Sequence, residues 1–198
     1  MRLILATKTQ TPEAVRAAYH AGARDFGENY VQEGIAKRGE LADLAGARWH
    51  MIGHLQSNKA KSAVEHFDLI HTLDSERLAV QIARVRPSPK VQVLIEVNLG
   101  GELSKSGVAP DRVESLIEAA RDLVEVVGLM TIPPEVEAAE QARPYFARMR
   151  ELRDRLAART GLALSELSMG MTADFEIAIE EGATIVRVGR AIFGERRR

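Results

Sequence analysis

The sequence predicts an α/β protein whose residues 1–198 fold as a single-domain (β/α)8 barrel, with eight parallel strands inside and helices outside. Short runs such as "VQVLIEVNL" and "TIVRVG" are nearly continuous in Val, Ile and Leu, which is typical of parallel strands buried on both faces. Eight such runs alternate with helical patterns, and no linker divides the chain. An open doubly wound sheet is the alternative, but no GxGxxG motif follows the first run.

The apolar runs and the helical patterns give the order of the elements. The expected strands are 3–7, 25–27, 48–53, 69–73, 91–98, 124–130, 164–169 and 184–189. The expected helices are 12–21, 30–44, 58–66, 75–85, 110–121, 138–160 and 173–181. Thr11-Pro12 and Ser75 indicate helix starts, and Gly22 and Gly161 indicate helix ends. Pro144 requires the longest helix to begin near it or to kink.

Composition excludes several classes of protein. The formal net charge of −1 gives no reason to expect nucleic acid or a membrane surface as a partner. The chain has no cysteine, no apolar run long enough to span a bilayer and no signal-peptide layout, so we expect a cytoplasmic protein. A monomer is expected because no coiled-coil repeat or apolar patch is evident. The residues 195–198 are expected to form an exposed tail.

A barrel of this class carries its site at the carboxyl ends of the strands, and the last two loops often bind phosphate. The loop "SMGMTADFE" offers the hydroxyls of Ser168 and Thr172 beside Gly170, and "VGRAIFG" offers Gly189 and the N–H of Arg190. Together they predict a phosphate cup built largely from neutral donors. The alternative is that these glycines only make turns and that the hydroxyls only cap helices.

Lys8 stands directly after the first expected strand. A lysine held against an apolar barrel mouth loses hydration, which lowers the pKa of its amine and lets it form a Schiff base with an aldehyde. A phosphorylated aldehyde held by the last two loops could reach this amine, and pyridoxal 5′-phosphate is the candidate cofactor. The alternative is a lysine that reaches water or pairs with a carboxylate.

Arg187 shares a strand face with Gly189, two residues further on. If that face points inward, the guanidinium could donate to the pyridine nitrogen of the cofactor, keep it unprotonated and make the ring a poor electron sink. The alternative is a buried arginine paired with Glu96. His50 and His54 have a zinc-like spacing but are expected on a strand and in a loop with no third ligand, so no metal is predicted.

Other polar residues follow the expected strands at the same barrel end. They are Glu28, Asn29, His54, Gln56, Asn58, Lys59, Asn98, Ser104 and Lys105.

Motifs along nearly the whole chain resemble the pyridoxal phosphate homeostasis protein family. They are "LATKT", "FGENYVQE", "WHMIGHLQSNK", "HTLDS", "VNLGGELSKSG", "GLMTI", "LSMGMTADFEIAI" and "VRVGRAIFG". The resemblance implies a barrel similar to the barrel domain of alanine racemase, with pyridoxal 5′-phosphate bound as a Schiff base on Lys8.

The resemblance also implies the other cofactor-binding positions. The residues matching the family's phosphate site are Ser168, Thr172, Gly189 and Arg190, Arg187 would face the ring nitrogen, and Asn29 and Asn98 would line the mouth. Arg190 stands where a small hydroxyl residue is frequent in the family, so a phosphate would gain a charged partner. Family members usually carry a further helix before the first strand, and we expect this chain to lack it.

The resemblance implies a role in the intracellular pool of vitamin B6, without robust catalysis and with apo-enzymes that use pyridoxal phosphate as possible partners. The main alternative is an amino-acid racemase that uses the same cofactor. Such an enzyme needs a second acid or base opposite the lysine, and the tyrosines at 19, 30 and 145 are expected in helices. A barrel enzyme acting on sugar phosphates is a further alternative.

Overall fold

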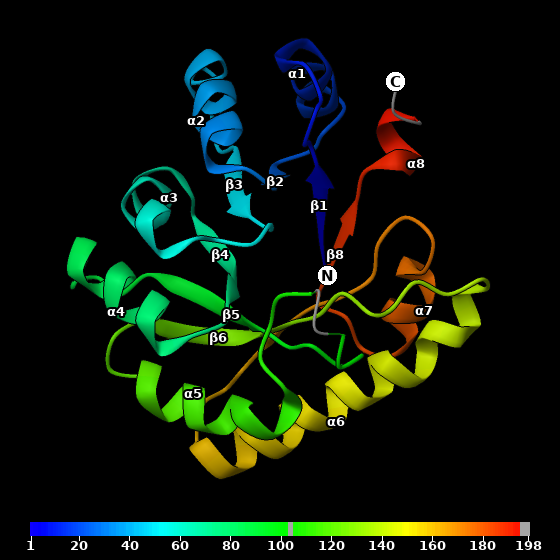
Figure 1. Ribbon diagram of the computed structural model, residues 1–198. Helices are drawn as coiled ribbons and strands as arrows, with labels where there is room; N and C mark the ends of the chain where they lie inside the picture. Colours follow the sequence, from blue (N-terminus) through cyan, green and yellow to red (C-terminus); the bar gives the residue numbers. More distant parts are fainter. Residues whose placement is uncertain (103–104, 195–198) are drawn as a thin grey trace.

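The computed structural model describes residues 1–102 and 105–194; the expected tail and Ser104 are outside these ranges. Eight parallel strands follow one another around a closed barrel, in which β8 pairs back onto β1 (Figure 1). The predicted (β/α)8 barrel is therefore confirmed. Within the described ranges, no helix is long and apolar enough to cross a bilayer.

The strands are short, and side by side they form the wall of the barrel. They are β1 (Arg2–Ala6), β2 (Asp25–Glu28), β3 (Arg48–Met51), β4 (Leu69–Leu73), β5 (Gln92–Glu96), β6 (Glu125–Met130), β7 (Glu166–Ser168) and β8 (Ile185–Val188).

The helices lie around the outside of the barrel (Figure 1). They are α1 (Pro12–His20), α2 (Val31–Glu40), α3 (Ala60–His66), α4 (Glu76–Val85), α5 (Val113–Ala120), α6 (Arg143–Thr160), α7 (Phe175–Glu180) and α8 (Arg190–Phe193), with 3-10 turns at Ser57–Lys59, Pro110–Arg112 and Ala139–Ala142.

Local signals explain the main helix boundaries. The hydroxyls of Thr11 and Ser75 accept hydrogen bonds from the first turns of α1 and α4. The longest helix starts at Arg143, so Pro144 occupies the first turn, where its missing N–H costs nothing. The helix predicted for 30–44 is shorter than expected: it begins at Val31 and ends at Glu40.

The apolar core has two parts. The larger part fills the space between strands and helices, and a smaller cluster inside the barrel consists of Ile4, Leu69, Leu94, Met130 and Ile185. The barrel centre is therefore packed with side chains rather than open, as usual for this fold.

The loop between β1 and α1 is held by a buried cluster that α2 supplies. The Lys37 ammonium donates to the Thr7 carbonyl, to Glu28 at 2.8 Å and to Glu33 at 2.7 Å. Glu33 in turn accepts the N–H of Thr9 at 2.5 Å. The backbone on both sides of Lys8 is thus fixed to one helix.

Thr9 adopts a left-handed backbone with φ of 65°, which is unfavourable for a β-branched residue. Such a conformation persists only where the surroundings hold it, and here the hydrogen bond to Glu33 does so. Burial raises the pKa of the Glu28 carboxyl, although hydrogen bonds from Lys37 and Thr7 lower it in part. Lys37 is therefore the cation that makes the burial of Glu28 tolerable.

Lys37→Met should lower the free energy of unfolding by about 3–5 kcal/mol at pH 7, because it leaves Glu28 buried without its cation. The pKa of Glu28 should rise further in the variant. Protonation then favours the folded state, so the loss should shrink as the pH falls from 7 toward the ordinary value of 4.5. Urea denaturation at pH 7 and pH 5 measures both effects.

Lys61→Met is the matched control, since Lys61 is exposed on α3. Its effect should stay within about 0.5 kcal/mol at either pH. An equal loss for Lys37→Met at both pH values would show that Glu28 is not the group left unpaired.

Candidate functional site

Closure of the barrel brings the loops after β1 and β8 together at the mouth. Leu5 pairs with Val188 across the seam, and the next residues along are Ala6 and Gly189. A Cβ atom on Gly189 would stand only 3.3 Å from the Ala6 carbonyl oxygen, so this close approach favours glycine. Lys8 follows two residues after Ala6 and is half-buried. The lysine strand and the predicted phosphate loop are therefore neighbours.

The loops after β7 and β8 also meet, as predicted. The N–H of Gly189 donates to the Thr172 hydroxyl at 3.3 Å. Gly170, with φ of 90°, packs where a Cβ would lie 2.5 Å from that of Ala178, and its carbonyl accepts the Arg187 N–H. Arg190 begins the short helix α8 and is exposed. Thr172, Gly189 and Arg190 thus gather in one place.

Arg187 points into the barrel, which is the condition on which its predicted role depended. It is 4% exposed, and its guanidinium donates to the Ser168 hydroxyl at 2.6 Å and to the Thr131 carbonyl at 2.9 Å. Burial lowers the pKa of Arg187 to about 10, which still leaves it charged at neutral pH. Within the described part of the chain no direct ion pair joins Arg187 to Glu96, but the charges of Glu96 and Asp174 attract the guanidinium and oppose part of the fall in its pKa, so the alternative explanation of Arg187 keeps partial support.

Ser168 lies in a different place from Thr172. Its side chain is fully buried in β7, and its hydroxyl contacts Arg187 and, at 3.0 Å, Nδ1 of His71. The structure therefore associates Ser168 with the arginine rather than with the loop hydroxyl of Thr172.

The polar contacts continue below Ser168. Nε2 of His71 lies 3.2 Å from Nδ1 of His50, whose Nε2 lies 2.9 Å from Asp25. Burial, together with the positive charges of Arg187 and Arg2, holds the pKa of His71 well below its usual range, so this histidine is neutral. The sequence singled out only His50, as a rejected metal ligand. The signal for the others was a polar residue inside an otherwise apolar strand, as in "LIHTL".

Glu96 supplies a carboxyl group at the mouth end of β5, on the same strand face as the interior residue Leu94. Oε1 accepts the Ser106 hydroxyl at 2.9 Å, whereas Oε2 is buried with no partner among the described residues. Burial raises the pKa of this carboxyl. A buried polar atom without a partner is costly, so a polar ligand at the mouth would relieve it.

The two asparagines differ in their surroundings. Asn29 is half-buried directly after β2, where its backbone packs against Gly53 of the neighbouring loop. The Asn98 amide donates to the carbonyls of Glu102 and Lys105, and its Oδ1 accepts the N–H of Gly101. Asn98 thus organises its own loop at the edge of the mouth.

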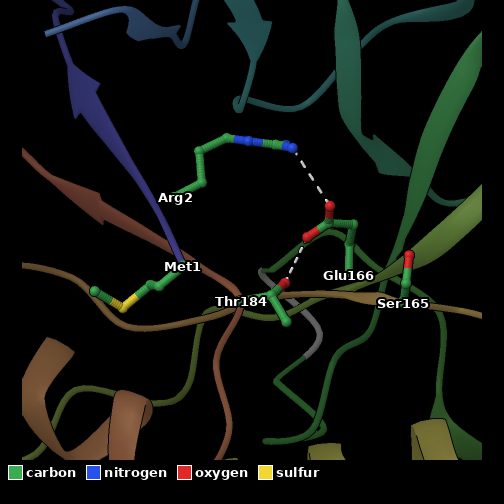
Figure 2. Close-up of a pocket in the computed structure, with 5 residues that line it drawn as sticks. All are labelled: Met1, Arg2, Ser165, Glu166 and Thr184. Carbon is green, nitrogen blue, oxygen red and sulfur yellow. Dashed lines mark hydrogen bonds and ion pairs between the residues drawn. The ribbon is translucent and has the colours of Figure 1, made fainter.

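A cavity of about 290 Å³ opens at the opposite, amino-terminal end of the barrel. Its lining includes Arg2, which points toward Glu166, and Thr184, whose hydroxyl donates to the same carboxylate (Figure 2). None of the predicted site residues lines it. Because barrels of this class carry their chemistry at the other end, the mouth remains the candidate site. Within the described ranges no group of His, Cys, Asp or Glu could hold a metal ion.

Comparison with known proteins identifies the family of this chain. Residues 4–197 match the family described as alanine racemase, N-terminal domain. The chain is 50% identical to a pyridoxal phosphate homeostasis protein of Aquifex aeolicus, covering 99% of this chain and 87% of the relative. It is 47% identical to the Pseudomonas aeruginosa protein of the same name, over 98% and 84%.

Solved structures agree. PipY of Synechococcus elongatus, described with pyridoxal phosphate bound, superposes with a TM-score of 0.90 at 41% identity, covering 98% of this chain and 92% of that one. Alanine racemase of Clostridium difficile superposes with a TM-score of 0.80 at 14% identity, over all of this chain and 53% of that one, and so shares the fold. The chain belongs to the alanine racemase N-terminal domain family and, within it, to the pyridoxal phosphate homeostasis proteins.

Proposed function

We propose that this protein binds pyridoxal 5′-phosphate at the barrel mouth and serves in the homeostasis of that cofactor, without robust catalysis. The observation that carries the proposal is the junction of β1 and β8, which sets Lys8 beside the loop of Gly189 and Thr172. An amine that can bind an aldehyde then stands next to groups that can donate hydrogen bonds to a phosphate, as a phosphorylated aldehyde requires. The relatives named for this role and the PipY structure support the same ligand.

Each of the residues has a distinct task in the proposal. The Lys8 amine holds the aldehyde carbon covalently, and Thr172, Gly189 and Arg190 bind the phosphate. Arg187 faces the ring nitrogen. Asn29 and Asn98 line the mouth, the latter through the loop that it organises. Ser168, expected from the sequence to bind phosphate, is better explained as a support for Arg187, because its hydroxyl contacts the guanidinium.

The residues around the ring explain a cofactor that is held but not used. When bound, pyridoxal phosphate supplies an aldehyde and a ring that can withdraw electrons once its nitrogen is protonated. Arg187, with a pKa of about 10, stays protonated at neutral pH and can only donate to that nitrogen. The ring therefore stays a poor electron sink, which suits storage and transfer to apo-enzymes. We expect these partners in the cytoplasm, and a monomeric carrier.

Racemisation is the activity that the proposal has to exclude. A racemase needs a second proton-transfer group opposite the lysine. The hydroxyl of Tyr19 donates to the Ala45 carbonyl beside α1, and Tyr145 lies in α6. Tyr30 precedes α2 and is 63% exposed. Because β2 ends at Glu28, Tyr30 is the tyrosine nearest in sequence to the carboxyl end of a strand.

The protein loaded with pyridoxal phosphate should therefore leave the enantiomeric ratio of L-alanine unchanged over hours. Chiral chromatography of the amino acid measures this. Sustained formation of D-alanine that Tyr30→Phe abolishes would establish the racemase alternative and overturn the carrier.

Lys8→Ala should abolish the covalent link to the cofactor while the barrel stays folded. Some pyridoxal phosphate should still bind non-covalently, because the phosphate contacts remain. Borohydride reduction followed by intact mass measures the adduct, and circular dichroism checks the fold. Lys61→Ala is the control, since it removes an exposed lysine on α3. An adduct of undiminished yield in Lys8→Ala would assign the aldehyde to another lysine.

Thr172→Ala should weaken the binding of pyridoxal phosphate by about 1–3 kcal/mol and leave the binding of pyridoxal unaffected, because only the phosphorylated ligand loses a hydrogen-bond donor. Thr172→Ser retains the hydroxyl and should bind like the parent protein. Fluorescence titration of both ligands gives the comparison. Equal losses for the two ligands would remove Thr172 from the phosphate site.

A further inference from the structure

We propose that Ser168, His71, His50 and Asp25 form a hydrogen-bond relay through the barrel that positions Arg187 toward a ligand at the mouth. The relay itself is a property of this chain. Its consequence for a ring nitrogen rests on the proposed function. The four residues act through Arg187 and are positioning residues.

The relay runs inside the barrel from its amino-terminal end to its mouth. Asp25 begins β2, His50 and His71 lie on β3 and β4, and Ser168 and Arg187 face each other from β7 and β8. Four contacts of 2.9, 3.2, 3.0 and 2.6 Å join the five side chains in that order. Each of the five is at most 6% exposed, so water cannot easily replace a lost contact.

The two ends of the relay together fix the direction in which its hydrogen bonds are donated. Burial opposes ionisation of Asp25, but hydrogen bonds from His50 and Arg48 outweigh it, so the pKa of this carboxyl lies below its usual range. An ionised carboxylate only accepts, and the proton must therefore be on Nε2 of His50. Whether Nδ1 of His50 donates or accepts is decided by the other end of the hydrogen-bond chain.

The mouth end supplies this decision. Arg187 can only donate to Ser168, so the Ser168 hydroxyl proton goes to Nδ1 of His71, the other partner of this hydroxyl among the described residues. Because His71 is neutral, its own proton is on Nε2 and is donated to Nδ1 of His50. The Ser168 oxygen consequently presents a lone pair to Arg187, which can only donate. Hydrogen bonds aligned in one direction polarise one another and strengthen the chain.

Protonation of His71 would reverse this direction, and the surroundings oppose it. The groups that face His71 are His50 from β3, Arg187 from β8 and the more distant Arg2 from β1. Two of these are cations, and the ring itself is fully buried. A charged His71 would also have to donate to Ser168, and the Ser168 proton would then have no acceptor among the described residues.

The relay fixes the plane of the guanidinium. One terminal nitrogen of Arg187 donates to Ser168 and the other donates to the Thr131 carbonyl. Because the guanidinium is a rigid planar fork, two contacts fix the directions of its remaining N–H groups. Ser168 cannot turn its proton toward a phosphate while His71 holds it.

Nitrogen-15 NMR of the histidines in the full-length protein tests the direction of the relay without any cofactor. We expect His71 to be neutral and protonated on Nε2 from about pH 5.5 to 8, although free histidine titrates in this range, and we expect the Nε2 proton of His50 at neutral pH. A cationic ring, or a proton on Nδ1 of either residue at neutral pH, would overturn the proposed direction.

The positioning of Arg187 is tested with pyridoxal phosphate and with an analogue that has carbon in place of the ring nitrogen. The parent protein should prefer the natural cofactor. Ser168→Ala should reduce this preference by about tenfold, because Arg187 loses the contact that directs it. Thr72→Val is the control, because Thr72 is the residue next to His71 and its buried hydroxyl donates to the Gly53 carbonyl, outside the relay. This variant should keep the preference.

The outcomes separate the relay from the proposed function. If the parent protein forms no borohydride-reducible adduct with pyridoxal phosphate, the proposed function fails, and the histidine spectra still decide the relay. If the adduct forms and Ser168→Ala keeps the full preference for the ring nitrogen, the positioning role is overturned. An equal loss of preference in Thr72→Val would likewise show a general packing effect.

Discussion

The pairing of β1 with β8 is the constraint on which the rest of this site depends. Without that seam, the first and last strands would be the edges of an open sheet, and Lys8 would stand far from Gly189. Closure instead brings Ala6 against Gly189, and the loop after β7 joins them through Thr172. Residues separated by almost the whole length of the chain thus form one mouth, at the strand ends where barrels of this class carry function.

Two buried cations flank this mouth, and each has a different kind of support. Lys37 is compensated directly by the carboxylates of Glu28 and Glu33, so it makes a tight ionic cluster that holds the backbone around Lys8. Arg187 instead makes its hydrogen bonds to neutral groups, the Ser168 hydroxyl and a backbone carbonyl, and the carboxylates of Glu96 and Asp174 attract its charge without a direct ion pair among the described residues. A cation whose hydrogen bonds go to neutral groups keeps more of its charge available to a ligand than a directly paired one.

The sequence predicted the fold well, because it depends on local signals. Continuous apolar runs, caps and glycines identify strands, helix ends and the loops after β7 and β8, whereas the spacing of Arg187 and Gly189 left open whether their shared face points inward. The roles of Lys37, His71 and Asp25 could not be predicted, since each depends on contacts between side chains on different strands or helices. Ser168 is an example, because its motif predicted a phosphate contact but gave no signal for the contacts of its hydroxyl with His71 and Arg187.

The proposed relay also gives a physical reason for the polar groups inside this barrel. A barrel interior filled only by apolar residues would give Arg187 no fixed orientation beyond packing. Here a line of neutral, oriented groups crosses from β4 to β7 and ends on the guanidinium, and it displaces part of the apolar packing that Ile4, Leu94 and Ile185 provide beside it. Buried polar groups of this kind lower stability unless every contact is made. Their presence is therefore best explained by the direction that they impose on the guanidinium of Arg187, whose two terminal nitrogens bond Ser168 and the Thr131 carbonyl.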